Sequence, residues 1–253
     1  MDNNNKTTSG AVSDRRYFQT EDSFIADDLR QMELAPNYNE WLFSLVKPFI
    51  GRRILEIGSG IGTMSKKIIQ ESDLLVGVEP NQYCARQLEK NFGDSPKFVL
   101  INKRLEETRY DDLFNKYKFD TVLCMNVLEH IQDDIGTLQF FEQLLEPGGR
   151  VVLLLPAFPQ VYGPIDKAVG HFRRYTKSSI NNALLKTSLV VEKNFYSNFP
   201  GLIGWFFNAR IKRSTGQSNS QIRLFNSLTP FISLVEKTLG CPIGLSLISI
   251  SKK

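Results

Sequence analysis

Residues 54–63, ILEIGSGIGT, are the stretch that decides the fold of this chain. An apolar run leads into three glycines at alternate positions, Gly58, Gly60 and Gly62, and a helical pattern follows them. Glycine allows positive φ angles and a close approach of the backbone to a ligand. A helix N-terminus adds free N–H groups. The stretch therefore predicts a strand, a ligand-binding loop and a helix.

An acidic residue ends the next apolar run, residues 74–78. Glu79 stands seventeen residues after Gly62, and a carboxylate there can accept hydrogen bonds from both hydroxyls of a ribose. A glycine pattern alone is a weak signal, but here the order strand, loop, helix, strand, acid is complete. The sequence thus predicts a nucleoside-type cofactor.

Strand and helix patterns alternate along the rest of the chain. Further strands are expected at residues 98–101, 119–125 and 150–155, and two more at 189–196 and 245–251. Asn81 and Thr176 are suited to cap the helices that follow them. Alternation of this kind predicts an α/β fold with a parallel sheet covered on both faces.

Three regions are expected, and the third contains an insertion. Residues 1–14 read as a flexible tail, residues 15–50 as N-terminal helices with Asn37 as a cap, and residues 51–253 as one domain. About fifty residues separate the last two strands, which is too long for a hairpin loop. A helical lid or an interface is therefore expected at about 198–242.

The amino-acid composition argues against a membrane-spanning protein, a zinc protein and a strongly basic nucleic-acid-binding protein. Of 253 residues, 42% are hydrophobic and 23% charged, an ordinary globular profile without an apolar run long enough to span a bilayer. The three cysteines are scattered, which argues for a reducing, cytoplasmic compartment and against a zinc site, so no metal is expected. A net charge of +4 gives no strong nucleic-acid signal.

The acidic residue before the first glycine indicates which cofactor is bound. A dinucleotide fingerprint starting at Gly58 would need Gly or Ala at position 63, where this chain has Thr63. The pattern E-x-G-x-G-x-G instead resembles motif I of the class I S-adenosylmethionine (SAM)-dependent methyltransferases. The stretches VGVEP (76–80), FDTVLCMNVLEH (119–130) and LEPGGR (145–150) resemble later segments of that family, in the same order.

The resemblance implies a Rossmann-like, doubly wound sheet of seven strands whose last strand is antiparallel. It also implies SAM as cofactor, bound by a set of residues from the four motifs. These are Glu56, which would brace the loop; Gly58, Gly60 and Gly62 beside the methionine; Glu79 and Pro80 at the ribose; Leu105, through backbone N–H groups near the adenine; and Asn126 and Val127 beside the sulfonium. Arg104 stands where the family often has an acidic residue near the adenine, a departure from the pattern.

The acceptor is expected in the loop after the fifth strand, because ligands of this fold bind beyond the carboxyl ends of the strands. His171 is either the base that takes the proton of a hydroxyl acceptor, with Asp166 as the residue that orients it, or a packing residue before the next helix. Tyr162, Arg173 and Arg174 are candidate substrate contacts, and Tyr17 is a further one from the N-terminal segment. Glu129 and His130 are interpreted as structural.

The function expected is methyl transfer to an oxygen, or a nitrogen, of a small or amphipathic molecule in secondary, lipid or glycan metabolism, as in the ubiquinone-type O-methyltransferase branch that the motifs resemble. The alternatives are an RNA or protein methyltransferase and a non-catalytic SAM-binding protein. Aromatic residues beside cations in residues 201–223 suit peripheral membrane contact, and a lid or homodimer surface is the other interpretation.

Overall fold

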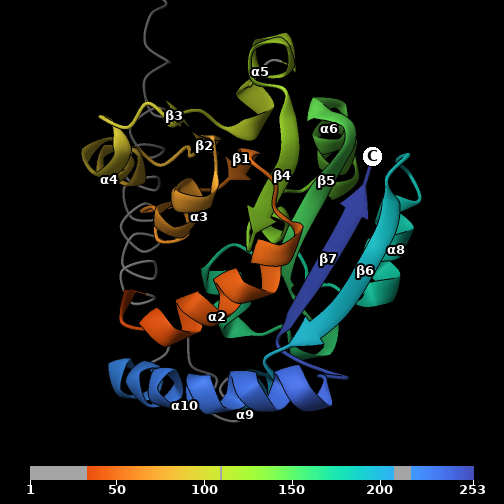
Figure 1. Ribbon diagram of the computed structural model, residues 1–253. Coiled ribbons are helices and arrows are strands. Elements are labelled where there is room, and N and C mark those ends of the chain that lie inside the picture. Colours follow the sequence, from red (N-terminus) through yellow and green to blue (C-terminus); the bar gives the residue numbers. More distant parts are fainter. Residues whose placement is uncertain (1–32, 109, 208–217) are drawn as a thin grey trace, which may run out of the picture.

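The sheet has seven strands in the order β3-β2-β1-β4-β5-β7-β6 (Figure 1). The computed structural model describes residues 33–108, 110–207 and 218–253. Strands β1 to β5 pair in parallel, and β7 is antiparallel to both of its neighbours. The predicted fold class is thereby confirmed. The strands are β1 Arg53–Ile57, β2 Leu74–Val78, β3 Phe98–Ile101, β4 Phe119–Met125, β5 Leu145–Pro156, β6 Val190–Ser197 and β7 Ser246–Lys252.

The first four strands begin and end where the sequence predicts. β5 differs, because it starts at Leu145 and takes in the Pro-Gly-Gly segment expected to lie before it. A register shift between Phe119 and Thr121 of β4 absorbs the extra residues. Gly148 N–H donates to the carbonyl of Lys253, and Lys253 N–H to that of Gly149, so the carboxyl end of the chain fastens this bulge.

Helices cover both faces of the sheet, as the continuous burial along β1 and β2 requires. Leu55, Val122 and Leu153 face the cluster that contains the residues of α6 and α8, whereas Ile54, Leu123 and Val152 face the cluster built from α2, α3 and α4. The helices are α2 Pro36–Val46, α3 Ser65–Glu71, α4 Gln82–Phe92, α5 Tyr110–Tyr117, α6 Asp134–Leu144, α7 Pro164–Ala168, α8 Lys177–Leu184, α9 Phe199–Phe207 and α10 Asn219–Leu239; short 3₁₀ turns are η1 Lys47–Phe49, η2 Leu105–Glu107, η3 Leu128–His130 and η4 Pro159–Val161.

The predicted helix caps meet different outcomes. The Asn81 side chain accepts from Tyr83 N and Cys84 N, and the Thr176 hydroxyl accepts from Ser179 N, so these two caps are confirmed. The Asn37 cap is wrong, because α2 starts at Pro36 with Ala35 as its N-cap. Proline suits the first helical position, and Asn37 instead bonds to a residue of α10.

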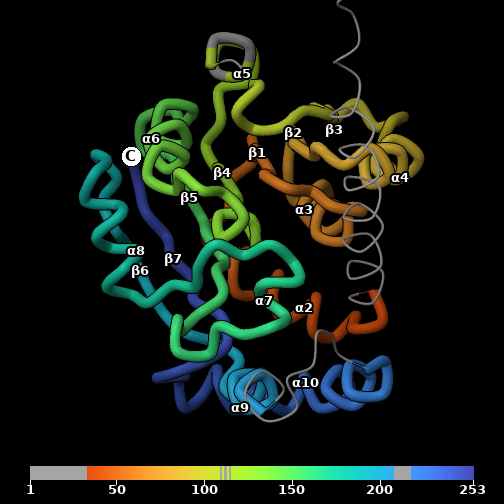
Figure 2. The backbone as a smooth tube through the Cα atoms, turned by 180° about the vertical axis from the view of Figure 1, so that it is seen from behind, coloured from red at the N-terminus to blue at the C-terminus, as the bar shows by residue number. Residues whose placement is uncertain are grey.

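The segment between β6 and β7 forms the predicted helical insertion. The chain leaves the sheet at Ser197 and returns at Ser246, its partner in the register. Asn226 of α10 accepts from the backbone N–H of Asn37 at 2.8 Å, and its carbonyl accepts from the Asn37 amide at 3.1 Å, so α10 is fastened to α2. Both insertion helices lie at the end of the sheet where β4 and β5 finish (Figures 1 and 2).

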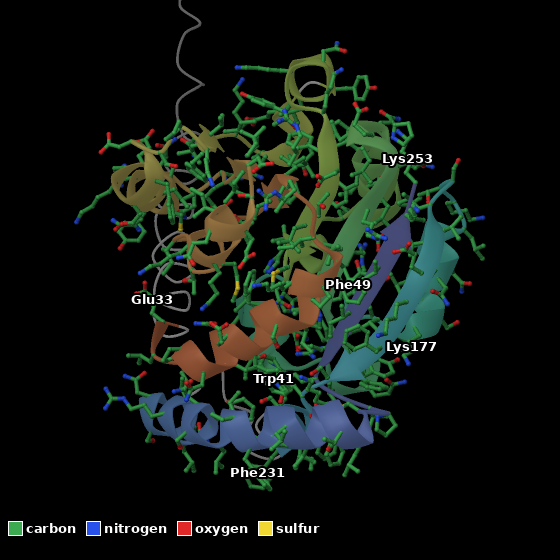
Figure 3. The ribbon with its side chains drawn as sticks, viewed as in Figure 1. Glu33, Trp41, Phe49, Lys177, Phe231 and Lys253 are labelled. Carbon is green, nitrogen blue, oxygen red and sulfur yellow. The ribbon has the colours of Figure 1, made fainter. Side chains whose placement is uncertain are left out.

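The insertion exposes an apolar face. Leu224, Leu228, Phe231 and Leu234 of α10 are 63%, 49%, 70% and 59% exposed, although helical spacing favours a packed stripe. Phe231 points away from the body of the molecule (Figure 3). Among the described residues, no helix combines the length and apolar character needed to cross a bilayer.

Candidate active site

The glycine loop after β1 has the predicted conformation. Gly58, Gly60 and Gly62 have φ angles of 72°, 56° and 89°, in the region that favours glycine. A Cβ on Gly58 would lie 2.4 Å from a methyl carbon of Val127, and one on Gly62 would lie 2.6 Å from the Phe92 ring. Glycine is therefore required at both positions by backbone angle and by space.

The carboxylate of Glu79 lies against this loop. Gly60 N–H donates to Glu79 Oε2 at 2.7 Å, and Asn81 N–H donates to Oε1 at 2.9 Å. The Glu79 carbonyl also accepts from the Asn102 amide at 2.7 Å, which ties the end of β2 to the end of β3. The structure thus brings together the loop expected beside the methionine of SAM and the acid expected at its ribose.

Glu56 lies beneath the same loop. Its side chain is buried and accepts from the Ser65 hydroxyl at 2.5 Å. Burial raises the pKa of Glu56 to about 7, opposed by the hydrogen bond from Ser65 and reinforced by the charge of Glu79. Glu56 therefore joins β1 to α3, which is the bracing role that the resemblance implies.

The remaining predicted cofactor residues lie after β2, β3 and β4, at the same edge of the sheet. Pro80 is exposed beside Glu79, and Leu105 begins the turn η2. Asn126 takes a φ of 53°, rare for a residue other than glycine, and donates its N–H to the Leu154 carbonyl at 2.8 Å. This strained turn directs the chain after β4 so that Val127 packs over Gly58. Their cofactor contacts stay predictions.

His171 is held by a buried acid. Its Nδ1 lies 2.8 Å from Asp166 Oδ1, and Asp166 also accepts from Arg174 Nε at 2.7 Å and from Gly163 N–H at 2.8 Å. Burial raises the pKa of Asp166, but the bond to His171 and the charge of Arg174 outweigh it and hold that pKa below its usual value. An ionised carboxylate only accepts hydrogen bonds. His171 Nδ1 therefore donates to Asp166, and Nε2 is the ring nitrogen outside this bond.

Two neighbours of His171 come from the turn after β4. Its Nε2 lies 3.8 Å from Glu129 Oε1, and its ring lies 4.6 Å from the ring of His130, edge to face. The backbone joins the same two loops, because Phe172 N–H donates to the Glu129 carbonyl at 2.8 Å. Residues 126–130 and the loop after β5 therefore form one wall of the site.

Glu129 is completely buried, and neither of its carboxylate oxygens has a hydrogen-bond partner in another residue. Burial raises its pKa to about 8. His130 is exposed when the whole residue is considered. Desolvation of its ring, and then the charge of His171, lower its pKa to about 4, whereas the backbone of Val169 acts to raise it. Sequence reasoning treated this pair as structural. The signal available was an acid and a histidine in succession directly after a strand that ends at the cofactor edge.

The candidate substrate contacts are engaged with the protein. Arg174 is buried on Asp166, and its guanidinium lies 4.6 Å from the ring centre of Trp205 in α9. Arg173 pairs with Asp134 at 2.8 Å. The Tyr162 hydroxyl donates to the His171 carbonyl at 2.7 Å. These three residues therefore shape the loop that carries His171, and Tyr17 lies outside the described residues.

Comparisons with known proteins agree with this arrangement. The profile of a methyltransferase domain family matches residues 24–194, more than half of the chain. A tRNA U34 carboxymethyltransferase of Pseudoalteromonas atlantica is 30% identical over 122 residues, which are 46% of this chain and 36% of the relative. A ubiquinone biosynthesis O-methyltransferase of Haemophilus ducreyi is 27% identical over 113 residues, 41% of this chain and 44% of the relative. The matches thus span less than half of these two relatives.

A solved structure extends the likeness to nearly the whole fold. The N-methyltransferase NodS of Bradyrhizobium japonicum, in complex with S-adenosylhomocysteine, superposes with a TM-score of 0.59 and 13% identity, over 93% of this chain and 97% of its own. At that identity the likeness concerns the fold alone. The glycine loop, the acid after β2 and the family match lead to one conclusion: this chain belongs to the methyltransferase domain family and has the fold of the class I SAM-dependent methyltransferases.

Proposed function

We propose that the chain methylates a hydroxyl group of a small or amphipathic molecule, with His171 as the base. The observation that supports this most is the pairing of His171 with buried Asp166 at the cofactor edge of the sheet. Asp166 fixes the hydrogen on Nδ1 and thereby presents Nε2, the nitrogen that can accept a proton. Histidine is the side chain best matched to proton uptake at neutral pH.

The reaction that follows from this geometry is a single displacement. The acceptor oxygen attacks the methyl carbon of SAM while the bond from that carbon to sulfur breaks, and the hydroxyl proton passes to His171 Nε2. The products are a methyl ether and S-adenosylhomocysteine. Holding both reactants in line supplies a large part of the rate. An amine acceptor would react in the same way.

An acceptor screen tests this function. Purified protein is incubated with SAM and with phenols, amphipathic hydroxy acids or transfer RNA, and S-adenosylhomocysteine release is measured. We expect turnover with a phenol or hydroxy acid, and a loss of at least a hundredfold in His171→Gln with SAM binding unchanged. Turnover with RNA alone would overturn the small-molecule assignment. Equal turnover in His171→Gln would overturn the base.

We also propose that the apolar face of α9 and α10 binds an anionic membrane surface, from which an amphipathic acceptor would reach the site. Large apolar side chains are exposed on both helices, Phe199, Ile203, Phe206 and Phe207 on α9 and Leu224, Leu228, Phe231, Leu234 and Leu239 on α10. The charges of α10 favour this partner: Arg223 and Lys237 are exposed, whereas Glu236 accepts inward from Ser197 Oγ and from the backbone of Asn198 and Phe199. Contact between Trp205 and Arg174 joins this face to the loop of His171.

A further inference from the structure

We propose that Glu129, His130 and His171 bind one divalent first-row transition-metal ion. One ligand atom from each residue can be chosen so that all three lie within 4.8 Å of one another. Glu129 and His130 come from the turn after β4, and His171 comes from the loop after β5. The Phe172 to Glu129 backbone bond holds the two segments in this position.

The carboxylate of Glu129 is the observation that points most directly to a cation. It is 0% exposed, and both oxygens lack a hydrogen-bond partner in another residue. A buried carboxylate without partners is unfavourable, and protein interiors pair such groups with charges or with metal ions. Arg174 directs its Nε to Asp166 and its Nη1 to the Ala157 carbonyl at 3.1 Å, and its charge lowers the pKa of Glu129 without outweighing burial.

His171 is arranged as a metal ligand would be. Metal-binding histidines give one ring nitrogen to the ion and donate the other N–H to a carboxylate or a carbonyl. His171 donates to Asp166, which Arg174 and Gly163 hold in turn. The nitrogen left on His171 is the one that faces Glu129, at 3.8 Å.

The donor set indicates the class of ion. Two imidazoles and one carboxylate suit zinc, iron or manganese and leave coordination positions open for water or a substrate oxygen. Magnesium, which prefers oxygen ligands, fits this set less well. The chain has two histidines and both belong to this cluster. The inference departs from the sequence-based expectation that no metal is bound.

The ion would change how a hydroxyl acceptor is activated, a consequence that rests on the proposed function. An acceptor oxygen bound to the ion would lose its proton more readily, as metal-bound water does. The proton would leave to solvent or buffer, while Glu129, His130 and His171 hold the ion, and the displacement at the methyl carbon would be the one proposed above. His171 would act as a ligand of the ion in place of a base.

Cobalt(II) is the probe for the site, because its visible absorption reports its ligands. Tag-free protein carrying Cys241→Ser, which removes the partly exposed thiol, is titrated with CoCl₂ in the absence of SAM and acceptor. We expect one cobalt per chain with nitrogen and oxygen ligands. Glu129→Gln, His130→Gln and His171→Gln should each weaken binding at least a hundredfold, and the positioning variant Asp166→Asn ten- to a hundredfold.

The control is Glu106→Gln, which removes an exposed carboxylate outside the cluster and should leave cobalt affinity unchanged. Circular dichroism and SAM titration show that each variant is folded. No cobalt binding by the parent protein, or binding that survives in the three ligand variants, would overturn the site. Because this titration needs no turnover, failure of the methylation assay would leave its result intact, and failure of cobalt binding would leave the methylation assay intact.

Discussion

At the scale of single residues, the site contains two carboxylates with different surroundings under one glycine loop. Glu79 accepts from two backbone N–H groups, whereas buried Glu56 accepts from the Ser65 hydroxyl. Burial raises the pKa of Glu56, and its hydrogen bond from Ser65 opposes that shift. We therefore test Glu79 by its effect on SAM affinity and Glu56 by its effect on the pH dependence of stability.

Replacing Glu79 by alanine should weaken SAM binding. A carboxylate that accepts from the ribose hydroxyls contributes about 1.5–3 kcal/mol for each charge-assisted bond, so the loss should be at most a few kcal/mol. Calorimetric titration with SAM measures it. Glu89→Ala, an exposed acid on α4, is the matched control and should bind like the wild type. Equal affinity in folded Glu79→Ala would remove the ribose assignment.

Glu56 should make stability fall as the pH rises. Its pKa of about 7 in the folded chain lies above the ordinary value of 4.5, so the folded state binds the proton more tightly than the unfolded state. The contribution of this group is then complete below pH 4.5 and is lost as the pH rises through 7, with an upper bound of about 3 kcal/mol. Urea unfolding of the wild type and Glu56→Gln at pH 5 and pH 8 measures it. If the free energy of unfolding of the wild type changes between pH 5 and pH 8 by no more than that of Glu56→Gln, the raised pKa of Glu56 is contradicted.

At the scale of elements, the loop after β1 depends on backbone angles that only glycine accepts easily. Gly58→Ala places a methyl group 2.4 Å from Val127 at a φ of 72°, so Val127 and the turn after β4 must shift. We expect a loss of about 1–3 kcal/mol in the free energy of unfolding, with weaker SAM binding. Gly204→Ala in α9 is the control, because nothing lies within 4 Å of its added Cβ.

The elements were predictable where one local rule decides them. Apolar runs fixed the bounds of β1 to β4, and the Asn81 and Thr176 caps followed from short-range hydrogen bonding. Asn37 was misplaced because its partner, Asn226, is 189 residues away. The environment of Glu129 was likewise hidden, since its neighbour His171 comes from another loop. Non-local contacts of this kind leave no periodic signal in a sequence.

At the scale of the whole molecule, the exposed face of α9 and α10 predicts binding to vesicles. Full-length protein should sediment with vesicles that contain phosphatidylglycerol, less with neutral phosphatidylcholine, and less at high salt. Phe231→Ser with Leu234→Ser should reduce binding at least tenfold. Leu185→Ser, which replaces a leucine 78% exposed after α8, is the matched control and should not.

The competing partner for this face is a second copy of the chain. Sedimentation velocity of the same variants separates the two cases. A dimer that dissociates in Phe231→Ser with Leu234→Ser, without any vesicle binding by the parent protein, would replace the membrane assignment by a homodimer. Vesicle binding by a monomer would support the membrane.

The register of β6 and β7 has a consequence for the evolution of this fold. Because Ser197 and Ser246 face each other across the ladder, the polypeptide departs from the sheet and rejoins it at one place. Whatever lies between these serines can be lengthened, shortened or exchanged without altering the strand order or the glycine loop. The insertion that selects a partner can therefore change during evolution while the cofactor-binding loop is conserved. A new insertion would have to replace the hydrogen bond between Asn226 and Asn37, which fastens α10 to α2.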